Sequence, residues 1–182
     1  MPAKIIDGTA IAKDIRSEVA SSAAELYSIH NVKSGLAAVL VGDDPASTIY
    51  VRNKGRACEE VGIYSETFNL KYGTSQKEIL SLVDNLNHDP KFSGILVQLP
   101  LPEHIQEGEI TRAIEPSKDV DGLHPTNLGL LLSGEPRLIP CTPAGVQQIL
   151  LRSGYDPSGK HVVICGRSNI VGKPVSAILG QK

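Results

Sequence analysis

The sequence contains no tryptophan, and aromatic residues make up only 4% of its 182 residues. Proteins that bind single-stranded nucleic acid usually stack the bases on aromatic side chains, so this class of partner is not expected. An excess of one charge is also missing, because 18 basic residues are balanced by 20 acidic ones, for a net charge of −2. No block of like charges stands out, which argues against a nucleic-acid tail or a membrane-binding patch.

Cysteine is scarce as well. Cys58, Cys141 and Cys165 are far apart and form no C-x-x-C pair, so neither a structural zinc site nor a disulfide framework is expected. A reducing compartment fits this usage best. The N-terminus lacks the apolar core of a secretory signal, and no apolar run is long enough to span a membrane. We therefore predict a cytoplasmic protein without a membrane partner.

What the sequence does contain is an alternation of short apolar runs with helical periodicity. Apolar residues make up 41% of the chain, which is enough for a sizeable core. Strands are expected at 35–42, 63–70 and 92–102, and helices at 9–29, 46–62, 74–90 and 104–114. A polar loop is expected at 115–127. The β-α-β-α-β order predicts an α/β fold, a three-layer N-terminal domain with a parallel sheet.

Local signals refine two of these helices. Ser75 and Glu78 have the spacing of a capping box, which predicts the start of the helix at 74–90. The first helix carries an apolar stripe at close to helical spacing. Its members are Ile11, Ile15, Val19, Ala23 and Leu26.

A second unit is predicted to begin near Cys141, which divides the chain into domains 1–140 and 141–182. Thr142 and Pro143 suit the N-cap and first position of a helix that Gly154 would end. The run from His161 onward then reads as a strand, a glycine turn and the start of a helix. About forty residues are too few for a complete dinucleotide-binding domain, which usually needs ~100–150.

Lys54 is an unusual residue on the helix at 46–62. The helical face that it shares with Tyr50, Ala57, Cys58 and Val61 is otherwise apolar. Its side chain could lie along the rim of the core and place the ammonium in water. Alternatively, it is a partly desolvated lysine that exchanges protons near neutral pH, with Tyr50 stacking on a flat ligand. Position alone leaves both readings open.

Further polar groups follow the third strand. Gln98 follows four apolar residues at its carboxyl end, where ligands of open α/β sheets collect. It could satisfy loop backbone groups or orient a catalytic partner. The run SKDVDGLHP places Asp119, Asp121 and His124 in a loop. Its D-x-D-G pattern lacks the other ligands of a calcium loop, so no metal site is expected. Aspartates here either form turns or accept hydrogen bonds from a ligand.

The segment CGRSNIVGKP departs from the usual G-x-G-x-x-G fingerprint, because Gly166, Ser168 and Gly172 give G-x-S-x-x-x-G. Backbone N–H groups at such a turn can hold phosphate. Arg167 could bind a 2′-phosphate, which favours NADP over NAD. This segment therefore predicts a cofactor-binding turn.

Taken in order, GDDPASTIYVRNKGRACEEVGI, GILVQLPLP, KDVDGLHPTNLG, PCTP and GRSNIVGKP resemble the signature segments of bifunctional methylenetetrahydrofolate dehydrogenase/methenyltetrahydrofolate cyclohydrolases. This resemblance implies NADP-dependent oxidation of 5,10-methylenetetrahydrofolate, and then hydrolysis of the methenyl product to 10-formyltetrahydrofolate. It also implies a Rossmann-like NADP-binding domain after the catalytic one, tetrahydrofolate derivatives as ligands and a homodimer.

The resemblance also assigns roles to residues. Tyr50 matches the tyrosine that stacks on the folate ring, and Lys54 matches the catalytic lysine of the hydrolysis step. Gln98 matches the glutamine that hydrogen-bonds this lysine, and Asp121 the carboxylate that grips the pterin. These four form the expected catalytic set. The backbone contacts to folate and the NADP turn are assigned to Val97, Leu99, Gly166, Arg167 and Ser168.

The physical chemistry agrees with these roles, because a cationic methenyl intermediate disfavours an ammonium beside it and so makes a neutral Lys54 amine available to activate water. Two other hypotheses remain. One is a folate-binding or dimerising fragment without turnover. The other is an NADP-dependent dehydrogenase of an unrelated substrate, which leaves the face carrying Tyr50 and Lys54 unexplained.

Overall fold

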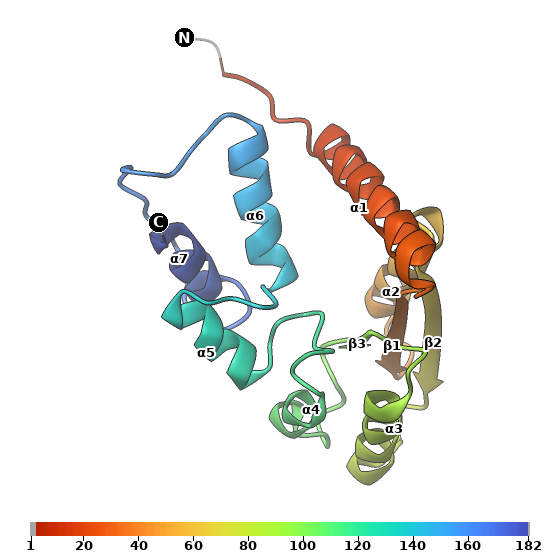
Figure 1. Cartoon of the computed structure of the whole chain (residues 1–182). Helices are drawn as coiled ribbons and strands as arrows, with labels where there is room; N and C mark the ends of the chain where they lie inside the picture. The colour runs from red at the N-terminus through yellow and green to blue at the C-terminus, as the bar shows by residue number, and fades with distance from the viewer. Residues whose placement is uncertain (1–2, 182) are drawn as a thin grey trace. The chain divides into compact units, whose positions relative to one another are not determined.

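The computed structural model describes residues 3–181 (Figure 1). The described residues divide into two compact units, one formed by residues 16–120 and the other by residues 3–15 together with 121–181. Each unit is described by itself below. Within the described residues, no helix is both long and apolar enough to cross a membrane.

The unit of residues 16–120 is built on a parallel three-stranded sheet. Its strands are β1 (Gly35–Val41), β2 (Tyr64–Leu70) and β3 (Gly94–Val97), in the order β2-β1-β3. Helix α2 (Pro45–Glu60) connects β1 to β2, and α3 (Gln76–His88) connects β2 to β3. The predicted β-α-β-α-β order and parallel sheet are confirmed.

Burial along the strands follows from their place in the sheet. The central strand β1 is buried at six of its seven positions, as the continuous apolar run 35–42 predicted. The edge strand β2 is only partly covered, and Thr67 and Asn69 are exposed. A parallel strand with helices on both sides needs apolar residues on both faces, whereas an edge strand does not.

Two apolar clusters cover the two faces of the sheet and make the domain three-layered. On one face, Val39 and Ile95 pack with Ile79 of α3 and Ile110 of α4 (Glu107–Ala113). On the other face, the core contains Ala38, Leu40, Leu96 and, from α2, Val51. The fold class predicted from the sequence is therefore confirmed.

Helix α3 begins as predicted. Glu78 N–H donates to Ser75 Oγ at 3.3 Å, and Ser75 N–H donates to Glu78 Oε2 at 2.8 Å. The next helix, α4, begins three residues later than the predicted His104. The preceding segment instead packs beside the start of α3, where Gln106 N–H donates to Gln76 Oε1 at 2.8 Å.

Helix α1 (Gly8–His30) matches the first predicted helix. Asp7 Oδ1 accepts hydrogen bonds from the N–H groups of Thr9 and Ala10, both at 3.0 Å, and so satisfies two donors of the first turn. None of the residues of α1 is buried, and Val19 in its apolar stripe is 39% exposed. The periodicity thus predicted the helix correctly, while its apolar stripe stays partly open.

The second unit contains α5 (Pro125–Ser133), α6 (Cys141–Arg152) and α7 (Gly172–Gly180). The start of α5 contradicts the predicted loop at 115–127. His124 Nδ1 accepts from Thr126 N–H at 3.1 Å and Pro125 occupies the first turn, so the last residues of that segment open a helix.

Helix α6 confirms the predicted helix, with Pro143 buried in its first turn. It starts two residues earlier than expected, at Cys141 rather than Pro143, so Thr142 lies inside it rather than at the N-cap. Gly154 follows its end with φ +81°, a conformation that favours glycine.

The strand predicted at 161–164 is wrong. These residues adopt no regular structure, and Val163 is 73% exposed. A strand is stable only when its N–H and C=O groups pair with a neighbour, and no described segment pairs with this one. The apolar run alone could not show whether such a neighbour is present.

Candidate functional site

Helix α2 carries the two residues of greatest interest. Asp44 caps it, since Asp44 Oδ2 accepts from Ser47 N–H at 2.7 Å and Pro45 occupies the first turn. Hydrogen bonds from Ser47 hold the pKa of the Asp44 carboxyl below its ordinary value. Val51 is buried against the sheet and fixes the rotation of the helix. The helix therefore presents a defined second face beside the one that it buries.

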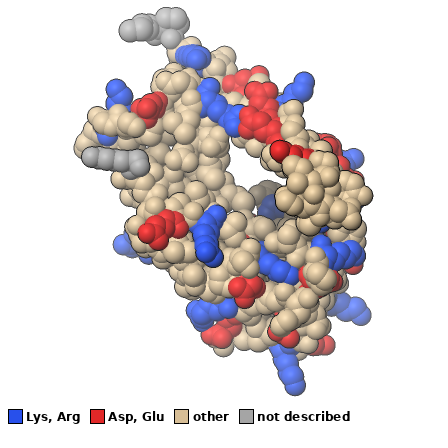
Figure 2. All heavy atoms as spheres, viewed as in Figure 1, with Lys and Arg blue, Asp and Glu red and all other residues tan. Residues whose placement is uncertain are grey.

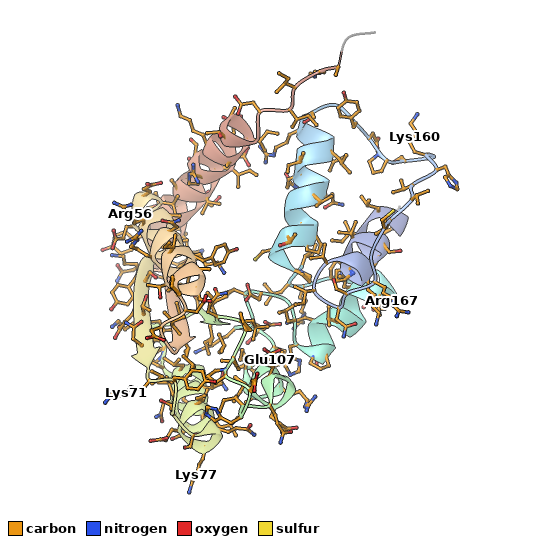
Figure 3. The ribbon with its side chains drawn as sticks, turned by 180° about the vertical axis from the view of Figure 1, so that it is seen from behind. Arg56, Lys71, Lys77, Glu107, Lys160 and Arg167 are labelled. Carbon is orange, nitrogen blue, oxygen red and sulfur yellow. The ribbon has the colours of Figure 1, made fainter. Side chains whose placement is uncertain are left out.

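Tyr50 and Lys54 share that second face, as the spacing predicted. Lys54 Nζ lies 4.6 Å from the centroid of the Tyr50 ring, within the range of a cation–π interaction. Lys54 is half-buried and Tyr50 is 52% exposed. In contrast, Arg56 points away from the sheet into solvent (Figure 3). The aromatic ring and the amine thus form a pair with one side open.

Cys58 lies one turn after Lys54 and is half-buried. Burial raises the pKa of its thiol, while the nearby Lys54 charge and a hydrogen bond with the Ser65 side chain oppose this rise. The thiol is therefore uncharged at neutral pH. Lys54 accordingly has a neutral neighbour at this position of the helix.

Gln98 directly follows β3, where its N–H donates to the Val39 carbonyl at 2.9 Å. Its side-chain Nε2 donates to the Leu99 carbonyl at 2.7 Å. The other end of the amide, Oε1, is buried and has no hydrogen-bond partner within the described part of the chain. Because the Nε2 bond fixes the orientation of the amide, an acceptor oxygen remains available.

The residues beside Gln98 are placed differently. The Val97 side chain is buried in the core, so only its backbone could contact a ligand. Leu99 is half-buried and packs against the same core. Asp119 is 1% exposed and pairs with Ile95 in a parallel bridge, which gives it a structural position.

In the second unit, Asp121 is half-buried, and the Cys141 thiol donates to its Oδ1 at 3.9 Å. Gly122 beside it has φ +66°, and a Cβ there would lie 2.7 Å from Pro140 N. The turn after Asp121 is therefore held tightly against the segment that leads into α6. Cys141 was not predicted to contact Asp121, and its place in the PCTP segment was the available signal.

The predicted cofactor turn precedes α7. Ser168 Oγ accepts from the N–H groups of Val171 at 3.1 Å and Gly172 at 3.3 Å, so the serine organises the start of the helix. A Cβ on Gly172 would lie 2.5 Å from the Gly166 carbonyl oxygen, which requires glycine at this position. Arg167 is exposed (Figure 3). The turn is tight, and the guanidinium group of Arg167 is open to a ligand.

Basic and acidic side chains are interspersed on the face of the molecule in Figure 2. In the range 3–181, no group of three or more His, Cys, Asp or Glu residues is arranged to hold a metal ion.

Comparison with known protein families shows to which family the chain belongs. The family model for the catalytic domain of tetrahydrofolate dehydrogenase/cyclohydrolase matches residues 6–121. The chain belongs to this family. The model for the family's NAD(P)-binding domain matches residues 140–182. The resemblance inferred from the sequence is therefore confirmed.

Individual relatives agree with the family assignment. The protein named "Bifunctional protein FolD" from Moorella thermoacetica is 55% identical over 98% of this chain and 64% of its own length. The protein of the same name from Magnetococcus marinus is 55% identical over 97% of this chain and 62% of its own length. The chain thus spans less than two thirds of the length of these curated relatives.

Solved structures of the family share the fold. The bifunctional FolD enzyme from Campylobacter jejuni is 46% identical, with a TM-score of 0.93, over 97% of this chain and 62% of its own. The dehydrogenase-cyclohydrolase from Trypanosoma brucei, solved with NADP and an inhibitor, is 37% identical, with a TM-score of 0.93, over 98% and 62%.

Proposed function

We propose that this chain belongs to an enzyme that oxidises 5,10-methylenetetrahydrofolate with NADP and then hydrolyses the methenyl product to 10-formyltetrahydrofolate. Residues 1–140 form the folate-binding catalytic domain in this proposal, and residues 141–182 begin the NADP-binding domain. The proposal is supported by the family membership, by the FolD name of the relatives and by the NADP in the Trypanosoma brucei structure.

The observation that carries the proposal is the position of the Lys54 amine over the Tyr50 ring, on a face of α2 that is only half covered. A flat ring system placed against Tyr50 would lie next to this amine. Tyr50 would then stack on the pterin, and the neutral Lys54 amine would remove a proton from the water that attacks the methenyl carbon. The uncharged Cys58 thiol is consistent with this role, because a thiolate there would favour the ammonium form of Lys54.

Gln98 and Asp121 would complete the catalytic set. The unpaired Gln98 Oε1 is an acceptor suited to a hydrogen bond from Lys54, which would orient the amine. The Asp121 carboxylate would accept hydrogen bonds from the N–H groups of the pterin. The backbones of Val97 and Leu99 would make further contacts with the folate.

The cofactor turn fits the phosphates of NADP. When bound, NADP accepts the hydride of the oxidation step. Arg167 presents an exposed guanidinium that would pair with the 2′-phosphate, which NAD lacks. Gly166 and Ser168 shape the backbone that would face the phosphates, and the close approach at Gly172 keeps that turn tight.

Two substitutions on α2 test the assignment. Each chain is assayed separately for NADP-dependent oxidation and for methenyl hydrolysis. Lys54→Met should abolish hydrolysis, since the amine is lost, while Arg56→Met on the outward face should leave both reactions unchanged. Normal hydrolysis by Lys54→Met would overturn the lysine role. Folate binding without NADP binding or turnover would reduce the proposal to a binding function.

We also propose a cytoplasmic homodimer. None of the three cysteines forms a disulfide within the described residues, which suits a reducing compartment. Sedimentation equilibrium measures the mass directly, and a concentration-independent monomer would contradict the dimer.

A further inference from the structure

A groove lies between α5 and α7, which run beside each other in the second unit (Figure 1). Its volume is about 610 Å³, within the range of ~300–1,000 Å³ that is typical of small-molecule sites. We call it the α5–α7 groove. It is lined by Leu128, Gly129 and Leu132 from α5 and by Lys173, Pro174 and Ala177 from α7.

Small residues leave the groove open between apolar walls. A Cβ placed on Gly129 would meet no heavy atom within 4 Å apart from its chain neighbours and the backbone of its own helix, although this glycine lies in the middle of that helix. Ala177 provides a similarly short side chain on the opposite helix. Leu132 is 72% exposed, so an apolar ligand that covered it would remove hydrophobic surface from water.

The single charged side chain at the edge of the α5–α7 groove indicates which kind of ligand would bind there. Lys173 is the only charged side chain among the described residues that line the groove. Its Nζ donates to Asn169 Oδ1 at 2.6 Å, which holds the ammonium at the rim. No carboxylate lies among these residues to neutralise it. An apolar trough with one fixed positive charge suits a molecule that has a hydrophobic body and a single negative charge.

The geometry points to a binding site for small aromatic or aliphatic carboxylates in the α5–α7 groove. The hydrophobic body lies between Leu128 and Leu132 on one side and Ala177 on the other, and the carboxylate pairs with Lys173. Lys173 and Pro174 come from the same GRSNIVGKP segment as the proposed cofactor turn, but Gly166, Arg167 and Ser168, which that turn uses, do not line the groove.

A matched pair of probes tests the site by isothermal titration calorimetry. 2-Naphthoate and its neutral amide have nearly the same shape but differ in charge. The chain should bind the acid more tightly than the amide by up to about fivefold, which is the upper end of the range for one exposed ion pair. Lys173→Met should remove this preference, whereas Lys160→Met, at an exposed lysine outside the groove (Figure 3), should keep it.

Filling the groove provides a second test. Gly129→Leu places a side chain in open space and favours the helix, so the variant should stay folded by circular dichroism and lose binding of both probes. Unchanged binding by this variant, equal affinity for acid and amide, or no saturable binding would overturn the proposal. Displacement of 2-naphthoate by NADP would also overturn it, because the groove would then belong to the cofactor site.

Discussion

Because Gln98 Oε1 has no hydrogen-bond partner within residues 3–181, replacing Gln98 is expected to stabilise the protein. Substitutions at partly buried positions usually destabilise it. A carbonyl oxygen buried without a partner costs about 1–3 kcal/mol. Gln98→Met keeps a similar shape and removes this oxygen, but it also loses the Nε2 bond to the Leu99 carbonyl, which contributes about 0.5–1.5 kcal/mol. The balance ranges from about 0.5 kcal/mol against the variant to about 2.5 kcal/mol in its favour. Its hydrolytic activity should fall.

Urea unfolding at neutral pH measures this balance. A gain of 1 kcal/mol raises the unfolding midpoint by about 0.3–1 M, given the usual slope for a small domain. Gln76→Met is the matched control, because Gln76 Oε1 does have a partner in the Gln106 N–H group. The control should lose about 0.5–1.5 kcal/mol. The contrary outcome is that Gln98→Met loses as much free energy of unfolding as Gln76→Met. The unpaired Gln98 oxygen would then not be destabilising the native protein, and there would be no reason to infer that it is kept for function.

Three further predictions concern stability. Ser75→Ala removes the cap of α3 and should lower the free energy of unfolding by about 1 kcal/mol in urea. The hydrogen bond from Lys91 holds the pKa of Glu66 below its ordinary value, so the stability from this pair is present near neutral pH and lost as the pH falls through that lowered pKa. The difference in unfolding midpoint between the original chain and Glu66→Gln should therefore shrink below about pH 4. Gly35→Ala places a Cβ 2.0 Å from the Lys91 carbonyl and should prevent stable folding, whereas Gly129→Ala, with no heavy atom from outside its own helix within 4 Å, should raise the melting temperature.

Elements whose signals are local could be predicted from the sequence. The apolar run of β1 and the capping box of α3 depend on residues only a few positions apart, and both occur as expected. The common face of Tyr50 and Lys54 follows from helix geometry alone. The start of α5 was missed because His124 is an uncommon N-cap residue and the segment before it is polar.

Features that depend on distant neighbours could not be predicted in the same way. The run at 161–164 has strand composition but no partner among the described residues, so it stays irregular. The contact between Cys141 and Asp121 joins residues 20 positions apart and needs the close turn at Gly122. Likewise, which end of the Gln98 amide is paired depends on the direction of the Leu99 carbonyl, which no sequence pattern specifies.

The neutrality of Cys58 suggests a last experiment on the proposed amine. Cys58→Asp would place a carboxylate one turn from Lys54, where the Ser65 side chain can hydrogen-bond it and so favour its charged form. An acid four residues from a lysine stabilises the ammonium form. The neutral Lys54 amine should therefore become about two- to tenfold less abundant at a given pH. The larger value applies if the two charges are partly desolvated. The acid limb of the pH profile for methenyl hydrolysis should therefore move upward by about 0.3–1 pH unit. Cys58→Asn, which has the same size without the charge, should keep the original profile. Identical profiles for the two variants would mean that proton transfer does not depend on the Lys54 amine.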